Sequence, residues 1–360
     1  MAKLLKDLYN AEYINLLALQ SAYFYPKFKQ NKFIKDIFNS SFKELELKQR
    51  MRHISTTLGT HLPNNYKESI EILKNIFSTM NYAYNLQNMI FQDFVEVFGL
   101  DDFEVSMDAL EHFTINSSSE FAIRQFIINT QTQSMKQMTL WSRSKNSHIR
   151  RLASEGCRPR LPWAVALPYF KKNPLEVLKI LELLKDDESK YVRKSVANNL
   201  NDISKDNPKI IKQITKKWIN QNKNRDALLK HGCRTLLKSS DKETLELFGF
   251  NEPLDIKIKN FKLPNNIALG SELNFSFDIL SDKELSKLRV EFSIDFLRKN
   301  GTHNTKVFKI IEGTYSANQK SISKNYSFKK ITTRVYYRGL HRVSIIINGV
   351  SFATKEFYLS

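Results

Sequence analysis

Three segments of the chain repeat one pattern, and this repeat limits the possible folds more than any other feature of the sequence. They are residues 148–155, 191–198 and 227–234, offset by 43 and then 36 residues. Each has an aliphatic residue, basic residues within the next two positions and a small residue four or five positions on. This pattern is typical of the second helix of HEAT-like units, where the small residue lets neighbouring helices approach. We therefore predict an α-solenoid.

The spacing of the apolar residues changes at Pro253. Before it, apolar residues recur at helical spacing, as at Ile70, Leu73 and Phe77. After it come alternating runs bounded by turn signals such as Asn300-Gly301 and Asn348-Gly349; the runs are 273–280, 288–296, 307–311 and 343–347. We expect a helical domain over residues 1–250 and a small β-sandwich over residues 254–360.

The charge balance indicates a polyanionic partner. The chain has 56 Lys and Arg against 37 Asp and Glu, a formal net charge of +19. Residues 254–360 hold 18 basic and nine acidic residues, so both predicted domains are basic, as expected if they hold one ligand between them. Neither phosphate-binding glycine motif, GxxxxGK[ST] or GxGxxG, is present, which argues against a nucleotide-cofactor enzyme.

Cysteine and histidine usage predicts neither a metal nor a disulfide. Cys157 and Cys233 are the only cysteines, and the sequence has no CxxC or HExxH motif. No apolar run approaches the roughly 18 residues that a membrane span needs. We expect a cytoplasmic, reduced protein that needs no cofactor and does not associate with membranes.

Stacked helix pairs form a concave surface, and the basic residues of the repeats would follow one flank of it as a groove for a phosphate backbone. These residues are Arg150, Arg151, Arg193, Lys194, Lys230 and Arg234, and we add Arg143 nearby. Two other interpretations stay open at this point, because HEAT-like solenoids commonly bind proteins and a charged helix face is often only solvated.

Residues 153–163 are the most unusual segment of the sequence, because they place an acid and a tryptophan within a basic repeat. Glu155 ends a repeat helix, and Gly156 would break it. The two prolines that follow would stiffen a loop presenting Trp163 together with Arg158 and Arg160, both of which we expect to contact DNA. Alternatively, Trp163 covers the core between repeats and Glu155 pairs with Arg158 or Arg160.

Two more acids occupy comparable places. Asp202 lies near the end of its repeat helix, as Glu155 does in the repeat before, so neighbouring repeats would bring both carboxylates close to Trp163. Glu120 follows three serines and opens a helix, where a serine cap and the helix dipole would also explain it. A carboxylate and tryptophan cluster in a nucleic-acid groove suits cleavage of an N-glycosidic bond, because carboxylates stabilise an oxocarbenium-like transition state. Both groups would favour a cationic, alkylated base.

Several segments resemble the AlkC branch of the AlkC/AlkD family of bacterial DNA-alkylation-repair glycosylases. In the helical part they are residues 45–53, 98–103, 119–124, 148–163 and 192–202. The C-terminal part, with Val307–Lys309 and Tyr336–Arg342, looks like the immunoglobulin-like domain of this branch.

The resemblance implies a HEAT-like glycosylase domain followed by an immunoglobulin-like domain that clamps duplex DNA. It implies excision of 3-methyladenine and 3-methylcytosine without base flipping, metal or cofactor. It also implies that Glu120, Glu155, Trp163 and Asp202 are catalytic, and we expect a monomer with no obligate protein partner. A catalytically silent scaffold that binds nucleic acid or an acidic protein is the alternative, and an RNA-binding solenoid is a third possibility.

Two clusters at turns of the β domain are expected to contact DNA phosphates or the minor groove. The first contains Arg298, Lys299 and His303, and the second contains Arg338. Solvated hairpin tips would look the same in the sequence.

Overall fold

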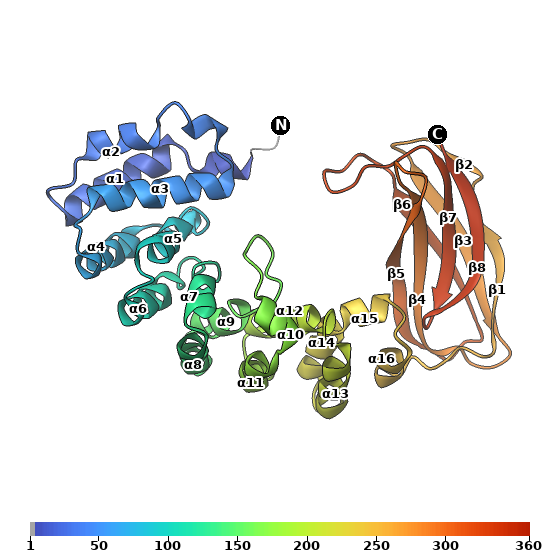
Figure 1. Cartoon of the computed structure of the whole chain (residues 1–360). Coiled ribbons are helices and arrows are strands. Elements are labelled where there is room, and N and C mark those ends of the chain that lie inside the picture. The colour runs from blue at the N-terminus through green and yellow to red at the C-terminus, as the bar shows by residue number, and fades with distance from the viewer. Residues whose placement is uncertain (1–3) are drawn as a thin grey trace. The chain divides into compact units, whose positions relative to one another are not determined.

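The computed structural model describes residues 4–360 and divides the chain into two compact units. Unit 1 comprises residues 1–207 and unit 2 residues 208–360. Unit 1 is helical, and unit 2 combines four helices with a β-sandwich (Figure 1). None of the described helices is long and apolar enough to cross a membrane.

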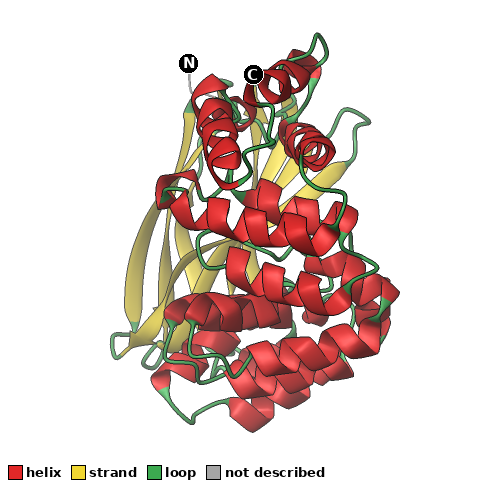
Figure 2. Ribbon diagram, turned by 90° about the vertical axis from the view of Figure 1, so that its left-hand side faces the viewer, coloured by secondary structure: helices red, strands yellow, loops and turns green. Residues whose placement is uncertain are grey.

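The helices of unit 1 stack against one another in chain order, as expected for an α-solenoid. Helix α3 packs against α5, α4 against α6, α8 against α9, and α9 against α12. Figure 2 shows this stack from the side. The α-helices are α1 (Ala11–Phe24), α2 (Gln30–Ile37), α3 (Leu47–His61), α4 (Tyr66–Thr79), α5 (Met89–Phe98), α6 (Phe103–Phe113), α7 (Ile123–Asn129), α8 (Gln131–Trp141), α9 (Ser147–Glu155), α10 (Pro168–Lys172), α11 (Leu175–Leu184) and α12 (Lys190–Ser204). Three short 3₁₀ turns lie between them, Leu5–Leu8, Phe42–Glu44 and Tyr82–Tyr84.

Asparagine and aspartate side chains set where many of these helices begin. Asn10, Asn65 and Asn146 each accept a hydrogen bond from a backbone N–H in the first turn of the helix that follows, and Asp102 does so for α6. Such caps satisfy backbone donors that have no partner within the helix. The polar residues between the apolar runs therefore determine the helix boundaries.

The repeat seen in the sequence corresponds to α9 and α12 of unit 1 and to α14 of unit 2. Where α9 meets α12, the small side chains face each other, and the Ser154 hydroxyl donates to that of Ser195 at 2.7 Å. The prediction of HEAT-like helical repeats is confirmed.

Unit 2 begins with α13 (Pro208–Trp218), α14 (Lys223–Gly232), α15 (Arg234–Lys238) and α16 (Lys242–Leu247). Its strands form one sheet in the order β1-β3-β6 and another in the order β2-β8-β7-β4-β5. They are β1 (Ile256–Lys262), β2 (Asn266–Ile267), β3 (Glu272–Ser281), β4 (Ser286–Leu297), β5 (His303–Tyr315), β6 (Gln319–Ser327), β7 (Gly339–Ile347) and β8 (Val350–Leu359). All pairs are antiparallel except β2 with β8.

The predicted β-sandwich is confirmed, and its core holds the apolar residues of the alternating runs. Phe275, Phe277, Phe292 and Ile345 are buried between the sheets. Strand β6 is absent from the predicted runs because its side chains are mostly polar and exposed, and the backbone pairing with β3 defines it.

The Asn348-Gly349 turn does more than reverse the chain between β7 and β8. Asn348 has a φ of 46°, and its buried side chain accepts a hydrogen bond from the backbone N–H of Arg289 at 2.8 Å. Its amide group donates to the carbonyl oxygens of Asn251, at 2.8 Å, and Lys287, at 3.2 Å. One side chain thus connects the segment after α16 to the sandwich.

Replacing Asn348 should separate these two roles. We expect Asn348→Gly, which tolerates a positive φ, to lower the free energy of unfolding of unit 2 by about 1–3 kcal/mol through the lost hydrogen bonds. Asn348→Ala should cost roughly a further 1 kcal/mol because alanine disfavours the left-handed conformation. Urea denaturation of both variants would measure the difference, and equal stabilities would contradict the backbone contribution.

Candidate active site

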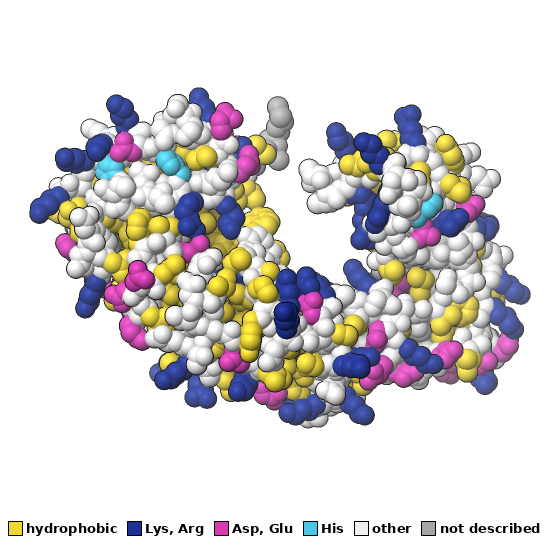
Figure 3. Space-filling model, viewed as in Figure 1, with side chains coloured by type: hydrophobic (Ala, Val, Ile, Leu, Met, Phe, Trp, Pro, Cys, Tyr) yellow, Lys and Arg dark blue, Asp and Glu magenta, His cyan; other side chains and the backbone are white. Residues whose placement is uncertain are grey.

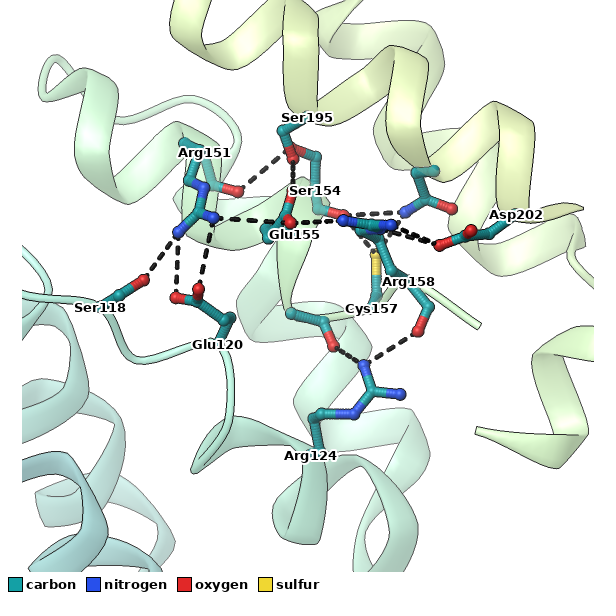
Figure 4. A network of polar contacts seen from close by, with 12 residues as sticks. Ser118, Glu120, Arg124, Arg151, Ser154, Glu155, Cys157, Arg158, Ser195 and Asp202 are labelled. Carbon is teal, nitrogen blue, oxygen red and sulfur yellow. Dashed lines mark hydrogen bonds and ion pairs between the residues drawn. The ribbon is translucent and has the colours of Figure 1, made fainter. Parts of the chain in front are cut away.

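A charge chain, in which acids and arginines alternate, connects the turn before α7 with α9, the loop after α9 and α12 (Figure 4). The guanidinium of Arg151 makes two hydrogen bonds to the Glu120 carboxylate, at 2.9 and 3.3 Å, and lies 3.5 Å from Glu155. The guanidinium of Arg158 joins Glu155, at 2.6 Å, to Asp202, at 2.8 Å. The acids expected to be catalytic are therefore connected to one another through two arginines.

Four elements of the fold contribute side chains to this charge chain. Glu120 lies in the turn before α7, and Arg151 and Glu155 lie one helical turn apart on α9. Arg158 follows α9 in the loop that leads to α10, and Asp202 lies in the last turn of α12. Since α9 packs against α12, the ends of these two helices place Glu155 and Asp202 on either side of Arg158.

Serine hydroxyls satisfy the remaining oxygens and donors of this chain. Ser195 of α12 donates to Glu155 Oε2 at 2.6 Å, and Arg151 donates to the Ser118 hydroxyl at 2.7 Å. Lys205 lies 3.2 Å from the second oxygen of Asp202. Burying charged groups is costly unless they are paired and hydrogen-bonded, and these contacts supply both kinds of partner.

Burial and the neighbouring carboxylates shift the pKa values of Arg151 and Arg158 in opposite directions. Burial alone would lower the pKa of Arg151, but Glu120 and Glu155 outweigh it and hold the pKa above its usual value. Burial likewise opposes ionisation of Arg158, whose pKa the carboxylates of Glu155 and Asp202 raise. Both guanidiniums are therefore permanent cations, and they keep the neighbouring carboxylates in fixed orientations.

A cavity of about 350 Å³ opens beside Glu120. Aromatic rings form much of its wall, with the Glu120 and Arg151 side chains at one side; the rings include Tyr9, Tyr82, Phe121, Trp163 and Tyr191. His148 also contributes to the wall, and burial together with the nearby Arg151 lowers its pKa, so the imidazole is neutral at neutral pH. The surface therefore presents one carboxylate among aromatic faces, both of which attract cations.

Trp163 lies on the loop of residues 156–167 that projects from the helices between α9 and α10 (Figure 1). Its side chain is 64% exposed, and its φ of 64° places the backbone in the left-handed region. Lys48 of α3 donates to the carbonyl oxygen of Trp163 at 2.7 Å. The loop thus holds a large apolar side chain in solvent, and the structure does not support the alternative that Trp163 covers the core.

Gly156 acts differently from the expected helix breaker. Its φ is −61°, which any residue can adopt. A Cβ here would lie 2.7 Å from side-chain carbons of Ile123 and Met138, so glycine is needed because α7 and α8 approach closely. The next residue, Cys157, is fully buried, and burial raises the pKa of its thiol to about 12.

Helix capping does not explain Glu120. Helix α7 begins at Ile123 with no side-chain cap, and the Ser119 hydroxyl donates to the carbonyl oxygen of Leu110 instead. Glu120 is held by Arg151 and lines the cavity. The pairing of Glu155 with Arg158, expected as an alternative to a functional role, is present, while Arg160 pairs with Asp206.

Several basic residues that the sequence places on a solvated face make hydrogen bonds and ion pairs within unit 1. Arg150 is buried against Asp187 at 2.6 Å and donates to the carbonyl oxygens of residues 144 and 145. Arg193, at the matching position of the next repeat, donates to the carbonyl oxygens of residues 187 and 188. In these two repeats the first basic residue therefore fastens the loop before its own helix. Arg158 is buried between two carboxylates, so Arg150 and Arg158 are both paired with acids inside unit 1.

Other predicted DNA-contacting residues remain at the surface. Arg143 and Lys194 are exposed, and Arg160 is partly exposed beside Asp206. In unit 2, Lys230 pairs with Glu312 of β5, and Arg234 donates to the carbonyl oxygen of His231. On the face drawn in Figure 3, Lys and Arg side chains are spread over both units.

The two basic clusters predicted in the β domain lie at one end of the sandwich. Arg298 and Lys299 are exposed in the turn between β4 and β5. His303, which follows them, contacts the carbonyl oxygen of Leu340 at 3.0 Å and so lies beside the start of β7, where Arg338 is exposed. The structure brings together these residues from different turns.

The sequence predicts one partner of the acids, in the alternative that pairs Glu155 with Arg158, but not the others. Arg151 is predicted to bind DNA, and nothing in the sequence indicates the contacts of Ser195, Lys48 and the aromatic wall. The signal available was the position of Glu155 between Arg151 and Arg158, with which it forms ion pairs in the structure. Within residues 4–360, no group of three or more His, Cys, Asp or Glu side chains is arranged to hold a metal ion.

Two family models match the chain. A model described as DNA alkylation repair enzyme matches residues 51–236, and one described as uncharacterised protein YhaZ, C-terminal Ig-like domain, matches residues 257–360. Uncharacterized protein YhaZ of Bacillus subtilis is 44% identical over 347 residues, 96% of each chain. The solved structure of Pseudomonas fluorescens alkylpurine DNA glycosylase AlkC, bound to DNA containing an abasic site analog, is 34% identical. The structural match covers 99% of this chain and 100% of the AlkC chain, with a TM-score of 0.95.

The buried position of Arg158 makes its removal costly. We expect Arg158→Met to lower the free energy of unfolding by about 3–5 kcal/mol, because Glu155 and Asp202 would remain buried without their cation. Arg160→Met, which breaks a more exposed pair two residues away, should cost less than about 1 kcal/mol. Urea denaturation followed by circular dichroism would compare them, and similar losses would show that the charge chain does not stabilise unit 1.

Proposed function

Since the chain belongs to the DNA alkylation repair enzyme family, we propose that it is a DNA glycosylase that hydrolyses the N-glycosidic bond of alkylated bases in duplex DNA. The observation that carries the proposal is the chain of buried carboxylates that reaches an aromatic-lined cavity at Glu120. The likeness to alkylpurine DNA glycosylase AlkC over the whole chain supports the same reaction. We propose 3-methyladenine and 3-methylcytosine as the substrates.

The chemistry of these lesions suits a site without a metal or cofactor. When the C1′–N bond breaks, the base takes the bonding electron pair, so a cationic base leaves as a neutral molecule and needs no general acid. The positive charge moves to the sugar as an oxocarbenium-like ion. A water molecule then bonds to C1′ and gives up one proton, completing hydrolysis.

The proposed roles follow from the access that each group has. Glu120 and Trp163 line the cavity and are placed to meet the sugar or base. Glu155 and Asp202 are more deeply buried, where low polarity strengthens their electrostatic effect on a developing cation. Because the arginines hold all three carboxylates in place before DNA arrives, little reorganisation accompanies the reaction. One of the carboxylates would orient the water.

The exposed loop of residues 156–167 suggests how the lesion is reached. A tryptophan that projects into solvent can approach a bent duplex from the groove side, so we propose excision without extrusion of the base. The DNA surface would include the exposed Arg143 and Lys194 of unit 1 and the basic end of the sandwich. The stretch between Glu312 and Glu356 supports this, because it contains eight Lys and Arg and no acidic residue.

The central test of the proposed activity is release of methylated bases. We expect the protein to release 3-methyladenine and 3-methylcytosine from methylated duplex DNA and to leave abasic sites. Glu155→Gln should slow single-turnover excision by roughly 100–1000-fold, since it removes one fixed negative charge near the reacting sugar. Binding to DNA with an abasic analog should persist in this variant.

Glu188→Gln is the matched control, because it makes the same change in a side chain that is 89% exposed, and it should excise at the normal rate. Salt-dependent DNA binding with no base release by the unmodified protein would instead support a non-catalytic scaffold. Preference for RNA over duplex DNA in competition would support an RNA-binding solenoid.

Replacing Arg298, Lys299 and Arg338 together with glutamine should weaken DNA binding and reduce its salt dependence. If each contacts a phosphate, the slope of log K against log salt should fall by about one per residue. The control triple variant replaces Lys242, Lys257 and Lys283, which pair with surface carboxylates. Equal slopes in the two triple variants would exclude this end of the sandwich from the DNA surface.

A further inference from the structure

Arg124 of α7 makes an unusual set of contacts behind the candidate active site (Figure 4). Its side chain is completely buried, and its guanidinium donates only to backbone carbonyl oxygens. Nη1 donates to those of Gly156 and Arg158, each at 2.9 Å, and Nε donates to that of Val165 at 2.6 Å. All three acceptors belong to the loop that carries Trp163.

No carboxylate pairs with Arg124 among the residues that the structure describes, and its Nη2 has no hydrogen-bond partner there. Burial lowers the pKa of this guanidinium to about 10, which still leaves it charged at neutral pH. A buried cation held by neutral groups alone is costly. Every hydrogen bond of this guanidinium goes to one loop, so Arg124 fixes the backbone of that loop.

The acceptors mark the two ends of the loop. Gly156 and Arg158 are at its start, and Arg158 is the cation that joins Glu155 to Asp202. Val165 lies two residues after Trp163. A single planar guanidinium therefore sets the distance between the loop's ends, and with it the place of the exposed tryptophan and of the arginine between the two acids.

We infer that Arg124 is a positioning residue for base excision. It fixes the loop so that Trp163 and Arg158 are in place before DNA binds, and it does not itself touch the DNA. The inference rests on the proposed glycosylase function. Displacing reacting groups by about 1 Å can cost 100-fold in rate, so the loss of Arg124 should affect the chemical step more than DNA affinity.

Arg50 of α3 offers a matched control. It is also buried and donates to three backbone carbonyl oxygens, those of Lys6, Lys43 and Leu45. None of these acceptors belongs to the loop of residues 156–167. Arg50 also lies 3.5 Å from Asp7. Arg50→Met therefore removes three hydrogen bonds to backbone carbonyl oxygens, as Arg124→Met does, but leaves every hydrogen bond of Arg124 to the loop in place.

The experiment compares Arg124→Lys, Arg124→Met and Arg50→Met in the full chain. Lysine keeps the charge but cannot bond both ends of the loop. We expect both Arg124 variants to lower the single-turnover excision rate at least about 10-fold while changing the affinity for abasic-analog DNA less than about threefold. Arg50→Met should excise within about twofold of the normal rate. If Arg124→Met does not fold, Arg124→Lys decides.

Tryptophan fluorescence supplies a readout independent of activity. Trp141 and Trp218 are 2% exposed, so the difference between each protein and its Trp163→Phe variant isolates Trp163. Time-resolved anisotropy should show faster local motion of Trp163 in the Arg124 variants and not in Arg50→Met. Unchanged anisotropy or unchanged excision in Arg124→Lys would overturn the inference. Absence of excision by the unmodified protein would overturn the proposed function, and the anisotropy would still decide whether Arg124 fixes the loop.

Discussion

A carboxylate removed from water must be paired, and this requirement organises the centre of unit 1. Glu120, Glu155 and Asp202 come from three different elements and share two arginines, so none of those elements can shift without breaking a pair. The packing of α9 against α12 and the course of the loop after α9 follow from where these charges meet. The same pairs that allow the acids to be buried also hold them in fixed positions.

This arrangement reconciles a structural and a functional interpretation of the acids. An ion pair is often taken as evidence that a carboxylate is only structural. Here the pairing would let three negative charges persist in an apolar setting beside a cavity, which is where they act most strongly on a nearby cation. The proposed chemistry depends on the pairs as much as on the acids.

Much of the fold followed from the sequence because it has a local cause. Helical spacing and a repeated small residue predict stacked helices, and alternation with Asn-Gly turns predicts the sandwich. The convergence of Glu155 and Asp202 was also accessible, since neighbouring repeats place equivalent positions side by side, whereas Glu120 followed only from the family resemblance. The long-range ion pairs of the arginines could not be predicted in the same way, because Arg150, Arg151 and Arg158 look alike in the sequence. Their partners, Asp187, Glu120 and Asp202, are 31 to 44 residues away along the chain.

The burial of Cys157 has a consequence for a protein that would work where alkylating agents are present. Thiolates are among the most reactive nucleophiles in a protein, and the thiol form reacts far less. Burial raises the pKa of Cys157 to about 12 and that of Cys233, the other cysteine of the chain, to about 11. Both sulfurs are therefore protonated and shielded from solvent, which would make the protein a poor target for the same reagents whose damage to DNA it is proposed to remove.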